Sequence, residues 1–408
     1  MKSVFLFFFV FLTTLCGHGQ TFSISQMNNP DPNLDDLGSV LLVGNRALSG
    51  SGTSQLYYDG SNWTMISSQA GGGISGIDKG GGEIYAIYSS TALYSWNDST
   101  NSWGLASNYP TGSFSAFRPF VLSENNVYFV TRDTENYGWI YRWDGTSFTA
   151  LSSEYWYTYC AIYVKDQNNI FVATYKNTNY DPMFIRYNSI TKSNTILFTF
   201  PGSRGNPNVI RSKDNNVFFI LMGCGDLYRW TNNQAKMDLI YESSTNDYYQ
   251  FGRDMIIIDN NNVVTCGGGG IRHITVPTSS VNVVYPTSNT FNVWSGSYNG
   301  QGRGMFVGDN GLILDMQVIG SVPDESINSA LKIYPNPAST SFTLEFPVFG
   351  VNEKTVELYS STGQLVKREH FQSFKTTLDI SALPSGMYLV NVLDKTGKIL
   401  ASKKLLVR

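Results

Sequence analysis

Aromatic residues and arginines gather in six polar segments of the sequence, each lying between two apolar stretches: residues 108–118, 132–138, 154–159, 176–182, 244–253 and 288–298. Aromatic planes can stack on sugar rings, and arginines or carboxylates beside them can bind hydroxyl or acidic groups. We therefore predict a ligand-binding face made of Tyr109, Arg118, Arg132, Tyr137, Trp156, Tyr180, Arg204, Tyr248, Tyr249, Arg253 and Trp294. The alternative, equally good for any one of these residues, is a strand end packed between neighbouring elements.

Residues that could carry out catalysis are sparse. After residue 19 the sequence has two histidines, His273 and His370, and no Cys/His spacing typical of a zinc site. No serine lies in a Gly-x-Ser-x-Gly motif. Carboxylate pairs such as Asp133 and Glu135 could serve a glycosidase, but a sequence does not give their separation in space. We predict no catalytic residue, no metal site and no cofactor.

Two short motifs resemble ligand loops only in part. The stretch "DPNLDD" at 31–36 begins like a calcium loop but lacks the glycine at position 6 and the glutamate at position 12, so we expect a solvated loop. The stretch "CGGGGI" at 266–271 lacks the Lys-Ser/Thr pair and the following helix of a phosphate-binding loop, so we expect a turn.

The beginning of the chain has the pattern of a secretory signal peptide. Lys2 precedes an apolar run from Val4 to Leu12, which is too short to span a bilayer, and Gly17 and Gly19 supply the small residues of a cleavage site. We predict a signal peptide over residues 1–19. Cys16 raises the alternative of a lipoprotein anchor, which the large Leu15 before it disfavours. No other stretch is long and apolar enough for a transmembrane segment.

The charge and the cysteines exclude further classes. The formal net charge of the 408 residues is −3 and no basic block occurs, so nothing indicates a nucleic-acid partner.

Three cysteines follow the signal segment: Cys160, Cys224 and Cys266. We expect small buried hydrophobic residues. If any pair forms a disulfide, Cys224 and Cys266 are the better candidates, because each follows the same strand of consecutive repeats.

A repeat of about 44 residues determines the expected architecture. Short apolar strands begin at Val40, Ile84, Val127, Ile170, Val217, Val263 and Met305. That spacing is typical of the four-stranded blades of a β-propeller. We therefore predict an all-β fold over residues 20–320, a seven-bladed β-propeller. A six-bladed ring with a frayed last unit is the alternative.

Each unit is expected to contain four strands. In the third unit they are "RPFVLS", "NVYFV", "WIYRW" and "SFTALSS". Asn and Asp fill the first turns, and Asp-Gly pairs such as Asp59-Gly60 and Asp144-Gly145 join the third and fourth strands. Trp63, Trp103 and Phe148 should pack between blades. The seventh unit ends weakly, and "FSISQM" near residue 23 is expected to pair beside it and close the ring.

The long aromatic segments occupy equivalent places in these units. In an antiparallel four-stranded blade the first and third connections lie at one end of the propeller. The second connection and the link to the next blade lie at the other. The aromatic segments are second connections and links, so we expect them to converge on one face.

The last part of the chain has a different pattern. A polar linker is expected over residues 321–330, and residues 331–408 contain six or seven short alternating strands. The charge also changes: residues 20–324 have 17 Lys and Arg against 24 Asp and Glu, whereas residues 325–408 have 10 against 7. We predict a small Ig-like β-sandwich.

This tail resembles the type A C-terminal sorting domain of cargo for the type IX secretion system. The resemblance rests on "YPNP" at 334–337, "GQLV" at 363–366, "LDIS" at 378–381, "LPSGMYLV" at 383–390 and "KKLLV" at 403–407. The sorting-motif residues are Tyr334, Pro335, Asn336, Pro337, Gly363, Leu378, Asp379, Gly386, Tyr388, Lys403 and Lys404. The prolines should restrict the backbone at a strand entrance, and Gly363 and Gly386 should occupy turns with positive φ.

The resemblance implies a Gram-negative cell, transit through the periplasm, and passage of the outer membrane by the type IX machinery, which is the expected partner. In that family the tail is often removed, and the cargo is released or attached to the outer face of the outer membrane. We expect an exported propeller that binds a glycan or surface polymer without catalysis. The alternatives are a propeller glycosidase or polysaccharide lyase, and a structural or adhesion protein of the cell surface.

Overall fold

The computed structural model describes residues 20–50, 54–66, 73–88, 92–109, 115–116, 118–132, 138–154, 157–176, 181–200, 205–243, 251–287, 291–319, 331–346, 354–371, 375–394 and 399–408. The chain divides into two compact units, Met1–Ile319 and Gly320–Arg408. Over the described ranges it forms strands and three short 3-10 helices, η1 (Asn232–Gln234), η2 (Val276–Thr278) and η3 (Asp309–Gly311). None of these helices has the length and apolarity needed to cross a membrane. The prediction of an all-β chain is confirmed.

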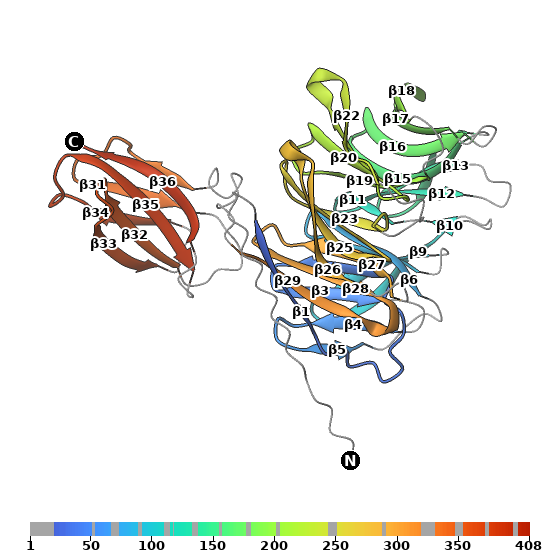
Figure 1. The fold of residues 1–408 in the computed structure, drawn as a ribbon, viewed down its shortest axis with the longest axis horizontal. Helices are drawn as coiled ribbons and strands as arrows, with labels where there is room; N and C mark the ends of the chain where they lie inside the picture. The colour runs from blue at the N-terminus through green and yellow to red at the C-terminus, as the bar shows by residue number, and fades with distance from the viewer. Residues whose placement is uncertain are drawn as a thin grey trace, which may run out of the picture. The chain divides into compact units, whose positions relative to one another are not determined.

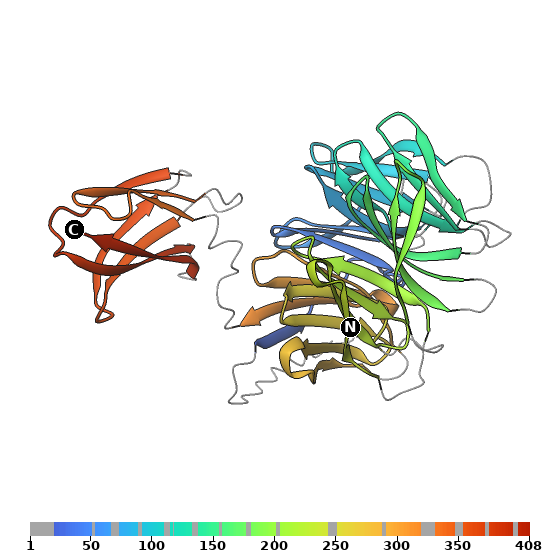
Figure 2. The same ribbon diagram turned by 90° about the horizontal axis from the view of Figure 1, so that it is seen from above.

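The first unit contains seven antiparallel sheets over its described residues, numbered here in chain order (Figures 1 and 2). Sheets 1 to 3 are β2 (Ser39–Val43), β3 (Arg46–Gly50), β4 (Gln55–Tyr58), β5 (Trp63–Met65); β6 (Ile74–Gly80), β7 (Glu83–Tyr88), β8 (Ala92–Asn97), β9 (Ser102–Asn108); and β10 (Ser115–Ala116) with β11 (Phe120–Ser123), β12 (Asn126–Arg132), β13 (Gly138–Trp143), β14 (Phe148–Glu154). Sheets 4 and 5 are β15 (Tyr157–Asp166), β16 (Asn169–Lys176), β17 (Pro182–Asn188), β18 (Ser193–Thr199); and β19 (Pro207–Ser212), β20 (Val217–Met222), β21 (Leu227–Thr231), β22 (Lys236–Tyr241). Sheets 6 and 7 are β23 (Asp254–Asp259), β24 (Asn262–Gly267), β25 (Gly270–Thr275), β26 (Ser280–Pro286); and β27 (Val293–Tyr298), β28 (Arg303–Gly308), β29 (Ile313–Ile319), β1 (Thr21–Gln26).

The sheets form a ring around a central channel, the arrangement of a β-propeller. Each innermost strand contacts the innermost strands of both neighbouring sheets, from β2 through β6, β11, β15, β19 and β23 to β27 and back to β2. A buried apolar cluster fills every junction between neighbouring sheets. Trp63, Trp103 and Phe148 belong to three of these clusters, as predicted. Burial of aliphatic and aromatic surface between the sheets is therefore what holds the ring together.

The N-terminal strand supplies the outermost strand of sheet 7. β1 pairs antiparallel with β29 from Thr21↔Ile319 to Gln26↔Leu314, and Figure 1 shows blue β1 beside orange β29. Phe22 and Ile24 pack against the cluster between sheets 6 and 7. The expectation that "FSISQM" closes the ring is confirmed.

The turns follow the predicted chemistry. Asn125 and Asn215 adopt left-handed φ in first turns, and Gly60 and Gly145 have φ of 108° and 98° in Asp-Gly turns. In the glycine-rich stretch, Gly268 and Gly269 form the tight turn between β24 and β25, as expected. One strand assignment was wrong: Val40 lies in innermost β2, whereas the other six repeat positions lie in second strands, so the matching strand of the first unit is β3.

The second unit contains two sheets that share one core. β30 (Lys332–Tyr334), β31 (Ser341–Glu345) and β34 (Lys375–Asp379) form one sheet, and β33 (Leu365–Phe371), β32 (Lys354–Ser360), β35 (Gly386–Asp394) and β36 (Ile399–Val407) form the other. One buried cluster contains residues of both sheets, as in a β-sandwich. The likeness to immunoglobulin domains stays a prediction.

Candidate binding site in the central channel

An ion cluster joins four of the sheets inside the channel. Asp254 is the first residue of β23, and its side chain is fully buried. Its Oδ2 lies 2.6 Å from Nη1 of Arg118, the residue two before β11. Its Oδ1 lies 3.4 Å from Nη2 of Arg211 in β19. Ser295 Oγ and the backbone N–H of Gly296 donate to Oδ2 at 3.1 and 3.0 Å. Sheets 3, 5, 6 and 7 therefore meet at one carboxylate.

The pKa values of two carboxyl groups in the channel are shifted in opposite directions. Burial alone would raise the pKa of Asp254, but the charges of Arg118 and Arg211, with the Gly296 hydrogen bond, hold it below its ordinary value. Burial raises the pKa of Asp78, in β6, and the Val121 N–H and the same two arginines offset only part of that rise. Asp254 is therefore held as an anion, whereas Asp78 is easier to protonate.

Both carboxyl groups also have a structural role. The Val121 N–H of sheet 3 donates to Asp78 Oδ2 of sheet 2 at 2.8 Å. Hydroxyl groups do the same at two other junctions: Ile77 N–H donates to Ser39 Oγ at 3.2 Å, and Val40 N–H donates to Ser295 Oγ at 3.3 Å. The inner edge of each innermost strand has no strand partner, and these side chains satisfy backbone donors there.

A second cluster lies at the end of the sheets where second connections and inter-sheet links emerge, which we call the long-connection end. The Arg253 guanidinium carbon lies 4.0 Å from the centre of the Trp294 ring. Trp294 Nε1 donates to a carboxylate oxygen of Asp309, and Asn292 N–H donates to the other at 2.7 Å. Arg253 precedes Asp254, so this aromatic and cationic cluster is covalently joined to the ion cluster.

Three of the residues predicted for the ligand-binding face thus lie in these two linked clusters: Arg118, Arg253 and Trp294. Tyr109 does not join them. It is buried between sheets 2 and 3 against Phe129 and Phe148, with ring centres 4.8 and 5.2 Å away, and is not available to a ligand. Outside the described residues lie Tyr137, Trp156, Tyr180, Arg204, Tyr248, Tyr249 and the side chain of Arg132. The described strand ends that flank the long segments all face the long-connection end, because every sheet is antiparallel.

Sequence reasoning missed a buried arginine at the same end. Arg272 in β25 is 1% exposed, and its Nε donates to Thr265 Oγ1 at 2.8 Å. Its guanidinium faces the rings of Tyr241 and Phe251, and burial lowers its pKa to about 10. The signal was a charged residue inside the apolar strand "GIRHIT". Asp254, before "MIII", gave the same kind of signal.

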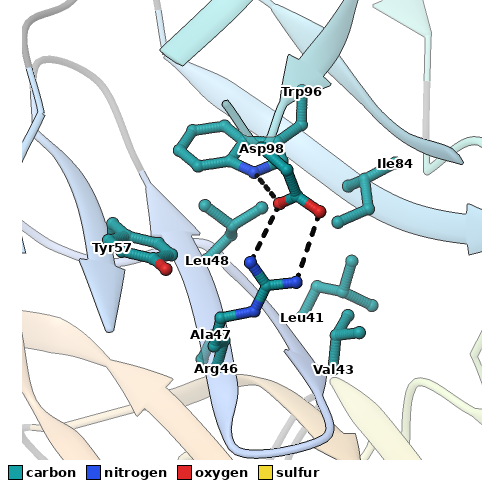
Figure 3. A pocket seen from close by; sticks show the side chains of 9 residues that line it. All are labelled: Leu41, Val43, Arg46, Ala47, Leu48, Tyr57, Ile84, Trp96 and Asp98. Atoms are coloured by element: carbon teal, nitrogen blue, oxygen red, sulfur yellow. Dashed lines mark hydrogen bonds and ion pairs between the residues drawn. The ribbon is translucent and has the colours of Figure 1, made fainter. Parts of the chain in front are cut away.

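At the opposite end, first and third turns connect the strands. There an ion pair between Arg46 and Asp98, which we call the clasp, lies beside a small apolar pocket (Figure 3). We call this end of the sheets the short-turn end. Arg46 Nη1 and Nη2 donate to Asp98 at 3.1 and 3.3 Å, and Trp96 Nε1 donates to the same carboxylate at 2.8 Å. Tyr57 stacks on Trp96. The pocket volume is about 10 Å³, room for about one water, so the clasp is best explained as a junction between sheets 1 and 2.

The other predicted motifs have structural explanations. Cys224 and Cys266 are buried in different clusters and do not form a disulfide with each other, and Cys160 is half-buried and likewise forms no disulfide. The loop at 31–36 differs from expectation because Asp31 is 2% exposed. The Asp31 carboxylate accepts hydrogen bonds from the backbone N–H groups of Asn33 and Asp35 and from the Ser54 hydroxyl. These hydrogen bonds fix the conformation of the loop. Across the described ranges no group of three or more potential metal ligands occurs.

The sorting-motif residues lie at strand joints of the second unit. Asn336 donates through Nδ2 to the Lys404 carbonyl at 2.8 Å and accepts from the Leu406 N–H at 2.9 Å, which attaches the bend after β30 to β36. Pro335 and Pro337 directly follow the end of β30, whereas we expected them at a strand entrance, and Gly363 has φ of 80°, as predicted. Gly386 begins β35 without positive φ, so that expectation was wrong.

The remaining sorting residues hold local structure. Tyr334 Oη donates to Glu345 at 2.9 Å, and Lys403 Nζ donates to the Leu331 carbonyl at 2.7 Å. Asp379 accepts from the Ser381 N–H at 2.9 Å, and Tyr388 Oη donates to the Pro384 carbonyl at 2.8 Å. Leu378 is fully buried in the shared core.

Each of the two units is similar to known proteins. Residues 332–408 match the family model of the secretion system C-terminal sorting domain. No curated protein sequence matches the chain. Among solved structures, YCF48 from Cyanidioschyzon merolae is similar, with 15% identity and a TM-score of 0.56 over 72% of this chain and 98% of that one. So is a structure described as YCF48 bound to D1 peptide, with 12% identity, a TM-score of 0.52, and coverage of 72% and 96%.

The WD40 β-propeller domain of Doa1 is similar to the same degree, with 12% identity, a TM-score of 0.53, and coverage of 72% and 97%. At these identities the likeness shows the fold alone. The sorting-domain match bears out the resemblance found in the sequence and implies export by the type IX secretion system. The chain is a β-propeller followed by a type IX secretion C-terminal sorting domain.

Proposed function

We propose that the exported propeller binds a glycan or other surface polymer at its long-connection end and does not catalyse a reaction. The observation that carries the proposal is that the Arg118–Asp254 ion pair and the Arg253–Trp294 stack are adjacent, because Arg253 and Asp254 are consecutive residues. Arg118 and Arg253 lie in two different inter-sheet links, and Trp294 lies at the start of β27. A surface assembled in this way offers a planar ring and cationic donors at one place, which suits sugar rings with hydroxyl or acidic groups.

The support around Trp294 favours a preorganised surface. Asp309 fixes the indole through Nε1, and Arg253 lies across the ring, so the side chain loses little conformational freedom when a ligand arrives. The carboxylate of Asp254, in turn, holds Arg118 by an ion pair of 2.6 Å. Rigid aromatic residues next to fixed charges are the combination that gives affinity to small contact areas.

A peptide is the other class of polymer to consider, because one similar propeller is described as bound to a peptide. Hydrolysis of a polysaccharide is the rival activity. Two carboxyl groups with divergent pKa values, Asp78 and Asp254, favour it in principle. Every hydrogen bond described above for these groups, however, connects them to the ring itself, and this favours binding over chemistry.

The test is a screen of the purified full chain against polysaccharides and peptides, scoring binding and the release of reducing ends separately. We expect binding to a glycan without release. Trp294→Ala and the pair Trp156→Ala with Tyr248→Ala should each weaken binding at least tenfold. Leu105→Ala, an exposed site on outermost β9, is the control and should leave it unchanged. Release of reducing ends would support the glycosidase, and binding to peptides alone would replace the glycan.

Export places this surface outside the cell. We propose that the protein, after signal-peptide removal and periplasmic transit, is released or attached to the outer face of a Gram-negative outer membrane. The sorting-domain match supports this route. Immunodetection on intact cells, compared with the culture medium, distinguishes the two fates. Accumulation in the cytoplasm would contradict both.

A further inference from the structure

The channel holds a cavity of about 330 Å³ that does not involve Arg118, Arg253 or Trp294. Its lining comes mainly from the second halves of β2, β6, β19, β23 and β27, toward the short-turn end. Arg118 and Asp254, by contrast, lie at the first residues of their strands or before them. Arg211 and Gly296 line the cavity and also contact Asp254, so the cavity borders the ion cluster and extends from it toward the short-turn end.

The charges that line the cavity are Asp78, Arg211 and Lys213. Asp254 is matched at 2.6 Å by Arg118, whereas Arg211 approaches it only to 3.4 Å, near the outer limit of a hydrogen bond. The Arg211 side chain is 37% exposed, so most of its five donors are not used by Asp254. Two cations against one carboxyl group give the cavity a positive balance.

The rest of the lining suits an organic molecule rather than a bare ion. Ile257 contributes aliphatic wall, and Ser297 contributes a hydroxyl that accepts a hydrogen bond from the Leu42 N–H at 2.9 Å. The volume lies at the lower end of the range of small-molecule pockets. Apolar walls with a few fixed polar groups are the usual composition of such pockets.

We propose that this cavity binds a small organic carboxylate, whose carboxylate group pairs with the guanidinium of Arg211. A planar guanidinium can hold a carboxylate through two parallel hydrogen bonds, which gives direction as well as charge. Lys213, whose Nζ donates to the Ile258 carbonyl at 2.9 Å, adds positive charge at the rim. The body of the ligand lies along the aliphatic wall, so both a sugar acid and a short fatty acid have the required chemistry.

The test uses the full chain and four probes: glucuronate, hexanoate, glucose and inorganic phosphate, with affinity measured by calorimetry. We expect at least one carboxylate to bind at least tenfold more tightly than glucose and phosphate. Preference for glucuronate would identify a sugar acid, and preference for hexanoate an aliphatic one. Because the contact is ionic, affinity should fall as salt rises. The proposal is overturned if neither glucuronate nor hexanoate binds more tightly than glucose and phosphate.

Two variants place the binding in the cavity. Arg211→Gln should weaken the preferred carboxylate at least tenfold, and Lys213→Glu should weaken it several-fold without touching Asp254. Arg229→Gln, which removes the same charge from a pair with Asp238 on outer strands, is the matched control and should bind normally. If Arg211→Gln does not fold, Lys213→Glu alone decides. Unchanged affinity in the folded variants would refute the site, whatever the polymer screen finds.

Discussion

The charge on Asp254 should be worth several kcal/mol to the propeller, and Asp254→Asn tests this directly. The amide keeps the shape of the side chain and removes its charge. Arg118 and Arg211 then lose their shared anion inside the channel. Breaking a buried ion pair on one side typically costs about 3–5 kcal/mol. Since the two arginine side chains are 30% and 37% exposed, we expect the lower end of that range, about 3 kcal/mol.

The loss in free energy of unfolding can be expressed as a shift in melting temperature. Unfolding entropy is about 2.1 cal/mol/K per residue, so a unit of about 300 residues loses roughly 1.6 °C for each kcal/mol. We expect Asp254→Asn to lower the propeller transition by about 5 °C in scanning calorimetry. The control is Asp238→Asn, the same change in a partly exposed pair with Arg229, which should cost about 1 kcal/mol or less and therefore under about 2 °C.

A double variant separates charge from shape. Adding Arg118→Met to Asp254→Asn removes one of the two stranded cations, the one that pairs more closely with Asp254, so the two costs should be less than additive, with a coupling of about 0.5–3 kcal/mol. If Asp254→Asn shifts the transition no more than Asp238→Asn does, the carboxylate is not the centre that the geometry indicates. Strict additivity in the double variant would lead to the same conclusion.

Three further predictions concern pH, ring closure and export. Burial lowers the pKa of His273 to about 4, so the unfolded chain takes up a proton first as pH falls below 6.5, and stability should decline by about 2 kcal/mol at pH 5. His273→Gln should remove this decline in calorimetry, whereas His370→Gln should keep it. Deleting Thr21–Gln26 should lower the melting temperature or cause aggregation, because β29 becomes an open edge, and an unchanged transition would mean that the ring closes otherwise. A chain truncated after Ser321 should fold but remain in the periplasm in cell fractionation, and normal surface delivery would contradict the role of the tail.

Most of the propeller could be predicted from the sequence because its signals are local and repeated. Apolar strands recur in every unit, with Asn or Asp-Gly turns in several of them, and each signal acts within a few residues. The one slip, at Val40, arose where the local pattern was ambiguous: "SVLLV" is as apolar as the second strands of other units, whereas the true second strand, "RALSG", is not. The pairing of β1 was predictable because the last unit lacked its fourth strand.

The candidate site was predictable only in part, because its contacts join distant parts of the chain. The predicted arginines and aromatics were chosen by composition, which cannot tell an exposed ring from a core ring such as Tyr109. Asp254 pairs with Arg118 across 136 positions of sequence (254 − 118), and no local pattern encodes that contact. The cavity is even harder to predict from the sequence, since its lining combines residues from five sheets.

The carboxylates of the channel explain how arginines can be held there at all. A ring of sheets leaves its innermost strands with unpaired backbone donors, and acidic or hydroxyl side chains satisfy them at several junctions. Asp254 and Asp78 are anchored by this structural requirement, and the charges that result offset the desolvation of Arg118 and Arg211. The two arginines are not equivalent, however. A ligand would have to compete with a contact of 2.6 Å for Arg118, but with one of 3.4 Å for Arg211. Within the channel, an incoming anion should therefore be recruited by Arg211, while Arg118 keeps the sheets together.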